Sequence, residues 1–116
     1  GGRLVERRAR SVKLETLTTA GDLHNAIVRR QLVRNLEKLE HCYEKERGAT
    51  PTLEATARAD FTIGKDGKVR TSTVRGTGHA NLDACIDAVI TRLEFPVPQR
   101  GEVVVTAPIV FKSGAF

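Results

Sequence analysis

Two cysteines, Cys42 and Cys85, are the residues of this 116-residue chain whose type and placement most directly suggest chemistry. Each is expected in an amphipathic helix, at the margin of its apolar face, where neighbouring helices would meet. A disulfide between them would close a long loop, which the loop-entropy treatment values at roughly 4 kcal/mol. We therefore expect one structural disulfide, which is typical of a protein in an oxidising compartment.

Two other interpretations of the cysteines stay open. They could be unpaired thiols that pack as small apolar side chains, or groups in a metal or catalytic site. A zinc site would draw on His41 or His79, but the sequence has no CxxC or HxxxH pair. A cysteine nucleophile would need an orienting group and an oxyanion site, which nothing nearby suggests. We expect no catalytic residue, no metal and no cofactor, and a domain that is not an enzyme.

The positive charge of the chain lies mainly at its start. The net charge is +5, and Arg3, Arg7, Arg8, Arg10 and Lys13 all fall within the first 15 residues. Residues 1–20 therefore predict a basic arm or linker, with at most a short strand over 12–20, ahead of a domain at 21–116. A basic binding module for an anionic polymer, nucleic acid or envelope polysaccharide, is an alternative function for this arm. With one Tyr, four Phe and no Trp, the chain has no row of aromatics for base stacking, so we expect no nucleic-acid partner.

Two segments have the three- and four-residue spacing of apolar side chains that predicts amphipathic helices. The first begins with Asp22 as its N-cap and ends at Gly48. The second follows Asn81 and ends before Phe95–Pro98, because proline cannot continue a helix. Their apolar stripes are Val28, Leu32, Leu36, Leu39 and Tyr43, and Leu82, Ile86, Val89, Ile90 and Leu93.

Alternating apolar and polar residues predict three strands. Leu53–Ile63 alternates strictly, Gly64–Gly67 forms a turn, and Lys68–Arg75 returns as a more polar strand that suits an outer position. Glu102–Lys112 is the last strand, and Pro108 within it removes a backbone donor. We therefore expect this strand to lie at a sheet edge or to be bulged at the proline.

These elements predict an α+β fold in the order α-β-β-α-β. A three-stranded antiparallel sheet would carry two helices on one face, as a two-layer sandwich in which each layer buries the apolar side of the other.

Several of these residues occur together in an order that resembles the AgmX/PglI C-terminal-domain family, part of the TonB C-terminal group. The resemblance covers about residues 20–113. The residues that carry it are Ala26–Gln31, Cys42–Glu44, Pro51–Leu53, Phe61–Val69, Leu82–Ile86, Phe95–Pro98, Gly101–Val105 and Phe111.

The resemblance implies a periplasmic domain at the end of a larger protein anchored in the inner membrane. It implies an adaptor or energy transducer, of the kind found in gliding-motility or outer-membrane transport machines. Such a domain binds an extended segment of an envelope or outer-membrane protein by adding a strand to its sheet. Many family members have an aromatic residue before the proline of the last strand, where this chain has Ala107.

Carried onto this chain, the docking edge is the last strand, because its unpaired backbone groups would be a template for a partner. The docking residues would be Val103, Val104, Val105, Thr106, Ala107, Ile109, Val110 and Phe111. Alternatively, this strand only completes the sheet, and the arm or residues 12–20 cover its edge.

Overall fold

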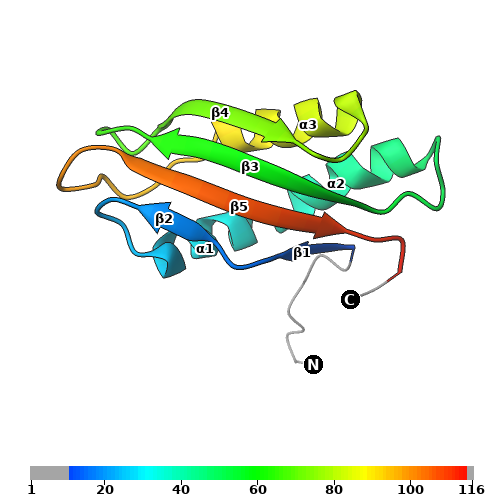
Figure 1. The fold of residues 1–116 in the computed structure, drawn as a ribbon, viewed down its shortest axis with the longest axis horizontal. Helices are drawn as coiled ribbons and strands as arrows, with labels where there is room; N and C mark the ends of the chain where they lie inside the picture. The colour runs from blue at the N-terminus through cyan, green and yellow to red at the C-terminus, as the bar shows by residue number, and fades with distance from the viewer. Residues whose placement is uncertain (1–10, 115–116) are drawn as a thin grey trace, which may run out of the picture.

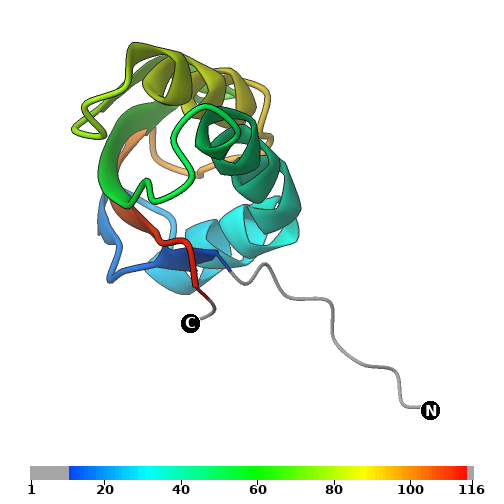
Figure 2. The ribbon, with the colours of Figure 1, turned by 90° about the vertical axis from the view of Figure 1, so that its right-hand side faces the viewer.

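The computed structural model describes residues 11–114, which form one antiparallel sheet with the helices on one of its faces (Figure 1, Figure 2). The sheet order is β1-β5-β3-β4, and β2 also pairs with β5. The elements are β1 (Val12–Leu14), β2 (Thr18–Ala20), α1 (Asn25–Arg34), α2 (Leu36–Arg47), β3 (Ala55–Ile63), β4 (Val69–Arg75), α3 (Ala80–Thr91) and β5 (Val103–Phe111).

The predicted mixture of helices and antiparallel strands is confirmed, but the number of elements is not. The sheet has five strands where three were expected, and three helices lie in the described residues where two were expected. The extra strands come from the segment before residue 21, which was expected to be an arm with at most one short strand. Val12, Leu14 and Leu17 of this segment are 3–4% exposed, so they belong to the core of the domain.

The predicted first helix is divided at Asn35 into α1 and α2. Asn35 leaves the helical conformation, its N–H bonds the carbonyl of Leu32, and its side chain donates to the carbonyl of Gln31 at 2.8 Å. A side chain that bonds nearby backbone in this way competes with the regular helical ladder. The helix also begins later than predicted, because His24, and not Asp22, supplies the N-cap by accepting from the N–H of Ala26.

The predicted turn between β3 and β4 is confirmed. The N–H of Gly67 donates to the carbonyl of Gly64 at 2.9 Å, and Gly67 has a φ of 84°. The carbonyl of Gly67 in turn accepts from Phe95 at 2.8 Å, which fastens the proline-containing connector to the turn. A Cβ at Gly67 would lie 2.3 Å from the carbonyl oxygen of Phe95, so only glycine fits.

The core lies between the sheet and the helices. One face of β3 and one face of β5 contribute alternate buried side chains, as strands with one solvated face do. The ring of Tyr43 stacks on Phe111 with centroids 5.3 Å apart, and its hydroxyl donates to the carbonyl of Leu53. Burial raises the pKa of this hydroxyl, so it remains a donor over a wider pH range.

Candidate functional site

The strand predicted as the docking edge, β5, lies inside the sheet. It pairs with β3 along all nine of its residues, and on its other side it pairs with β1 and β2. The prediction that β5 is a free edge is therefore wrong, and the alternative, that residues 12–20 cover it, is correct. The alternation of β5 buries Val103, Val105, Ala107, Ile109 and Phe111, whereas Val104, Thr106 and Val110 are on the face away from the helices.

Pro108 is compatible with this inner position because the covering strand is bulged opposite it. Three residues, 15–17, lie between the pairs Leu14–Ile109 and Thr18–Thr106, whereas β5 has only two residues there. The N–H of Glu15 donates to the carbonyl of Pro108, so the backbone of Pro108 faces this bulge. The missing donor therefore weakens no bond of the β3–β5 ladder. The prediction that the last strand is itself at an edge or bulged at Pro108 is wrong, because β5 pairs with β3 in unbroken register and the extra residue lies in the segment that covers it.

The outer edge formed by β1 and β2 is short and partly occupied. The guanidinium of Arg29 donates to the carbonyls of Leu14 and Glu15, at 3.4 and 3.3 Å. Side chains and bulges of this kind are common ways to protect an edge from pairing with another chain. This edge is therefore a poor template for a partner strand.

The opposite edge, β4, is different: within residues 11–114 it pairs with β3 alone. The prediction that this strand takes an outer position is confirmed. Thr71 and Thr73 lie opposite Thr62 and Asp60 of β3. Because antiparallel bonds alternate along a strand, the ladder directs the backbone N–H and C=O of Ser72 and Val74 away from β3, toward the open edge.

Each face of β4 is built differently. On the helix side, the hydroxyl of Ser72 donates to the carboxylate of Asp87 in α3, and Val74 packs against the core. On the other side Thr71 and Thr73 are exposed. The edge is thus a threonine-rich strand whose inner face packs against α3.

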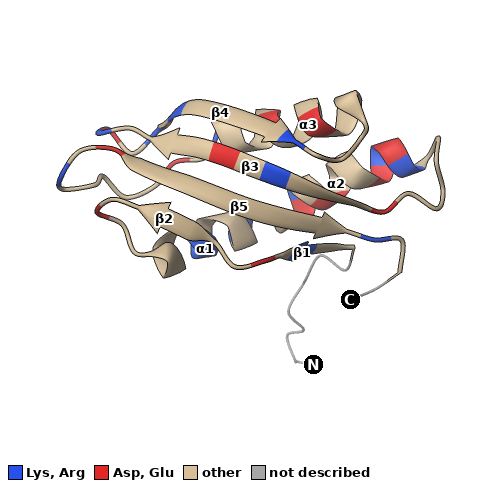
Figure 3. Ribbon diagram, in the orientation of Figure 1, with Lys and Arg blue, Asp and Glu red and all other residues tan. Residues whose placement is uncertain are grey.

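The open face of the sheet carries a charged cluster on β3 and β4 (Figure 3). Asp60 lies 2.9 Å from Arg58 and 3.8 Å from Arg75, and it accepts from the hydroxyl of Thr106 at 2.8 Å. Partial burial acts to raise the pKa of Asp60, but the hydrogen bonds and positive charges around it outweigh burial and lower that pKa. Asp60 therefore stays ionised and links β3 to both neighbouring strands.

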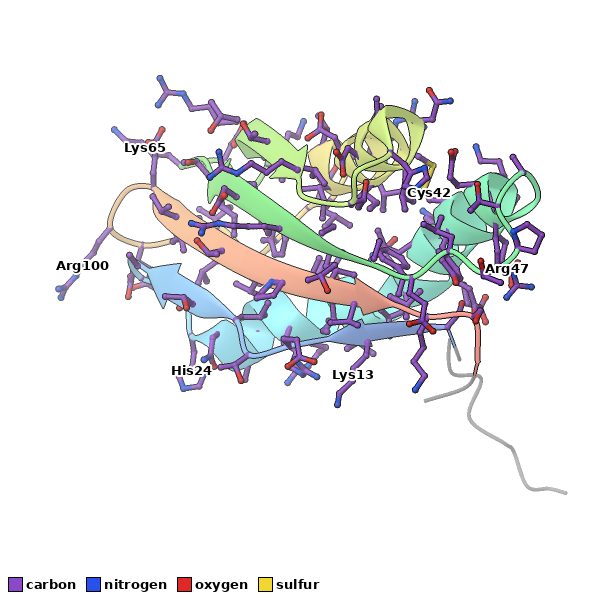
Figure 4. All side chains as sticks on the ribbon, turned by 45° about the vertical axis from the view of Figure 1, so that its right-hand side comes forward. Lys13, His24, Cys42, Arg47, Lys65 and Arg100 are labelled. Carbon is purple, nitrogen blue, oxygen red and sulfur yellow. A yellow bond between two sulfur atoms is a disulfide. The ribbon has the colours of Figure 1, made fainter. Side chains whose placement is uncertain are left out.

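The predicted disulfide between Cys42 and Cys85 is confirmed, with a Cα–Cα distance of 5.7 Å (Figure 4). It joins α2 to α3. Of these two helices, α3 packs on β4 and β3, whereas α2 packs beside β1 and stacks Tyr43 on Phe111 of β5. With both sulfurs bonded to each other, neither cysteine presents the thiolate that a zinc site or a nucleophile requires. Among residues 11–114, no three His, Cys, Asp or Glu side chains gather as metal ligands.

Most of the positive charges of the predicted basic arm lie outside the described residues, namely Arg3, Arg7, Arg8 and Arg10. None of the helices in the described part of the chain has the length and apolar character needed to cross a membrane. The sequence signal for the outer position of β4 was its polarity, because Lys68–Arg75 is the most polar of the predicted strands.

Searches against protein-family models, curated proteins and solved structures find no match to this chain.

Proposed function

We propose that this domain is a non-enzymatic periplasmic adaptor that binds an extended segment of an envelope protein by adding it as a strand to β4. The observation that carries the proposal is the open edge of β4, which has no strand partner other than β3 in residues 11–114. The disulfide supports the compartment, because such bonds persist where thiols are oxidised. The resemblance to TonB-type domains supports strand addition and membrane anchoring of the full-length protein.

The geometry of the edge suits a short partner strand. Ser72 and Val74 offer outward backbone donors and acceptors, which give affinity without specifying sequence. The bulge in the β3–β4 ladder between Thr62 and Ile63, and the bridge between Lys68 and Glu94, limit the open edge at its start. We therefore expect a partner segment of a few residues centred on Ser72 and Val74.

Replacement of Ser72 by proline tests this site. The proline removes a donor that faces the open edge and leaves the β3–β4 ladder intact, because the N–H of Ser72 does not face β3. Ser72→Ala is the matched control, since it removes the same hydroxyl bond to Asp87 but keeps the backbone donor. Peptides selected for binding from a displayed library of envelope-protein segments serve as the probe.

The expected result has three parts. Selected peptides should slow amide hydrogen exchange at Ser72 and Val74, bind Ser72→Ala as tightly as the original chain, and lose binding to Ser72→Pro. Affinity should change little with salt, because main-chain pairing, unlike binding of an anionic polymer, releases few counterions. Equal affinity for both folded variants, or protection only at other strands, would exclude β4 as the docking edge.

A further inference from the structure

A groove of about 450 Å³ lies between α2 and α3, directly over the disulfide. Its floor is apolar and is formed by the Cys42–Cys85 bridge, Ala88, Val89 and Leu93. This volume is in the range of sites for small molecules. Figure 4 shows Cys42 where α2 faces α3, so the covalent bridge holds the two walls together.

The rim of the groove is predominantly basic. Lys38 and His41 of α2 and Arg92 at the end of α3 line the groove together with one carboxylate, Glu37. Lys38 and Arg92 are exposed, and neither side chain forms an ion pair or hydrogen bond with another residue in the described range 11–114. The groove thus has two cations beside its apolar lining, and neither is ion-paired with Glu37 or with another residue of the range 11–114.

We propose that this groove binds a small amphiphilic anion, a monocarboxylate with an alkyl body. The alkyl body would lie on the disulfide and on Val89, and the carboxylate would lie between Lys38 and Arg92. Burial of the alkyl body supplies most of the affinity, and the two cations select the sign of the head group. The groove contains no residue of β4, so this site is independent of strand addition.

Three probes of equal chain length separate the two contributions: octanoate, octanamide and octylamine, each titrated below its aggregation threshold. Chemical-shift changes at the amides of Cys42, Cys85 and Val89 report binding. We expect octanoate to bind saturably. The affinity should decrease from octanoate to octanamide to octylamine. Exposed charge pairs are individually weak, so the difference between the anion and the cation should be roughly tenfold.

The double variant Lys38→Gln with Arg92→Gln tests the head-group site. It should weaken octanoate roughly tenfold and leave octanamide unchanged, because only the charge interaction is lost. Lys45→Gln is the matched control, since Lys45 lies on α2 but not in the groove. Val89→Ala should weaken all three probes alike by reducing the apolar floor.

Each of several results would overturn the proposal. Octylamine could bind as tightly as octanoate, or the double variant could retain full octanoate affinity. Shift changes confined to residues outside the groove, or no saturable shift with octanoate, would equally exclude the site. Because the readout is direct, none of these results depends on whether β4 binds a partner.

Discussion

The carbonyl of Pro108 accepts a hydrogen bond from the N–H of Glu15, with nitrogen and oxygen 2.9 Å apart. This bond lies between the short ladders of β1 and β2 and joins them into one cover over β5. Pro108, which in the sequence suggested a free edge, is therefore the residue to which the covering segment is hydrogen-bonded. The cover also brings three apolar side chains into the core, so it contributes to stability as well as to edge protection.

Removal of residues 1–20 should unfold the domain or make it self-associate. Val12, Leu14 and Leu17 are buried, and burial of such side chains is worth about 1.5–3 kcal/mol each. Their sum is a large share of the roughly 5–15 kcal/mol that stabilises an ordinary domain, and the deletion also exposes the edge of β5. Thermal unfolding and size-exclusion chromatography measure the outcome. A chain that begins at Ser11 is the control, and equal melting temperatures for the two would contradict this role of residues 12–20.

Reduction of the Cys42–Cys85 disulfide should lower the free energy of unfolding by roughly 4 kcal/mol, because the unfolded chain regains the freedom of a long loop. Urea denaturation with and without a thiol reductant measures the difference. The variant with both cysteines replaced by alanine should show reduced stability and no response to reductant. A reductant effect that persists in that variant would show that the loss has another cause.

Tyr43→Phe should destabilise the domain by about 1–3 kcal/mol, because it leaves the buried carbonyl of Leu53 without its donor. The phenylalanine ring keeps the stacking on Phe111, so the change isolates the hydroxyl. Chemical denaturation provides the measurement. Tyr43→Leu, which also removes the stacking on Phe111, should lower the free energy of unfolding further than Tyr43→Phe does. Unchanged stability of Tyr43→Phe would show that the bond to Leu53 contributes nothing.

The ionised form of Asp60 should stabilise the fold in a pH-dependent way. Its folded pKa lies below the ordinary value of 3.8, so its contribution is present above that value and is lost as pH falls through the folded pKa. Asp60→Asn should therefore be less stable than the original chain at neutral pH and nearly equal to it in strong acid. Denaturation at a series of pH values gives the two curves. Parallel curves over the whole acid range would contradict the contribution of Asp60.

Local sequence pattern was sufficient for the β3–β4 hairpin, for α3 and for the disulfide. The hairpin and the helix have signals within a few residues, the Gly64–Gly67 turn and the spacing of Leu82, Ile86 and Ile90. The disulfide joins residues 43 positions apart, but each cysteine carries its own local signal, a place at the margin of an apolar helical face. The division of the first helix was missed, because the apolar stripe continues through Asn35 and only the side-chain bond to Gln31 shows the break.

The place of β5 in the sheet was not predictable from its own residues. Pro108 lacks a donor on one side only, and the sequence does not tell which neighbour lies on that side. The neighbouring segment, residues 12–20, was hard to recognise as strand because of its bulge. Val12 and Leu14 are two positions apart, but Leu14 and Leu17 are three apart, so the period of two is interrupted. The free edge of the sheet was therefore assigned to the wrong strand.

The covalent bridge also sets how far the domain can be stretched. The described chain enters and leaves the sheet at one point, since the N–H of Lys112 bonds the carbonyl of Ser11. If tension pulled those two points apart and unravelled the sheet, the segment between the cysteines, a sequence separation of 43, would lengthen the tether only by the 5.7 Å between its Cα atoms. With the cysteines reduced, the same segment would extend to roughly 140–155 Å. The oxidised domain thus has a much shorter maximum extension than its length in residues implies.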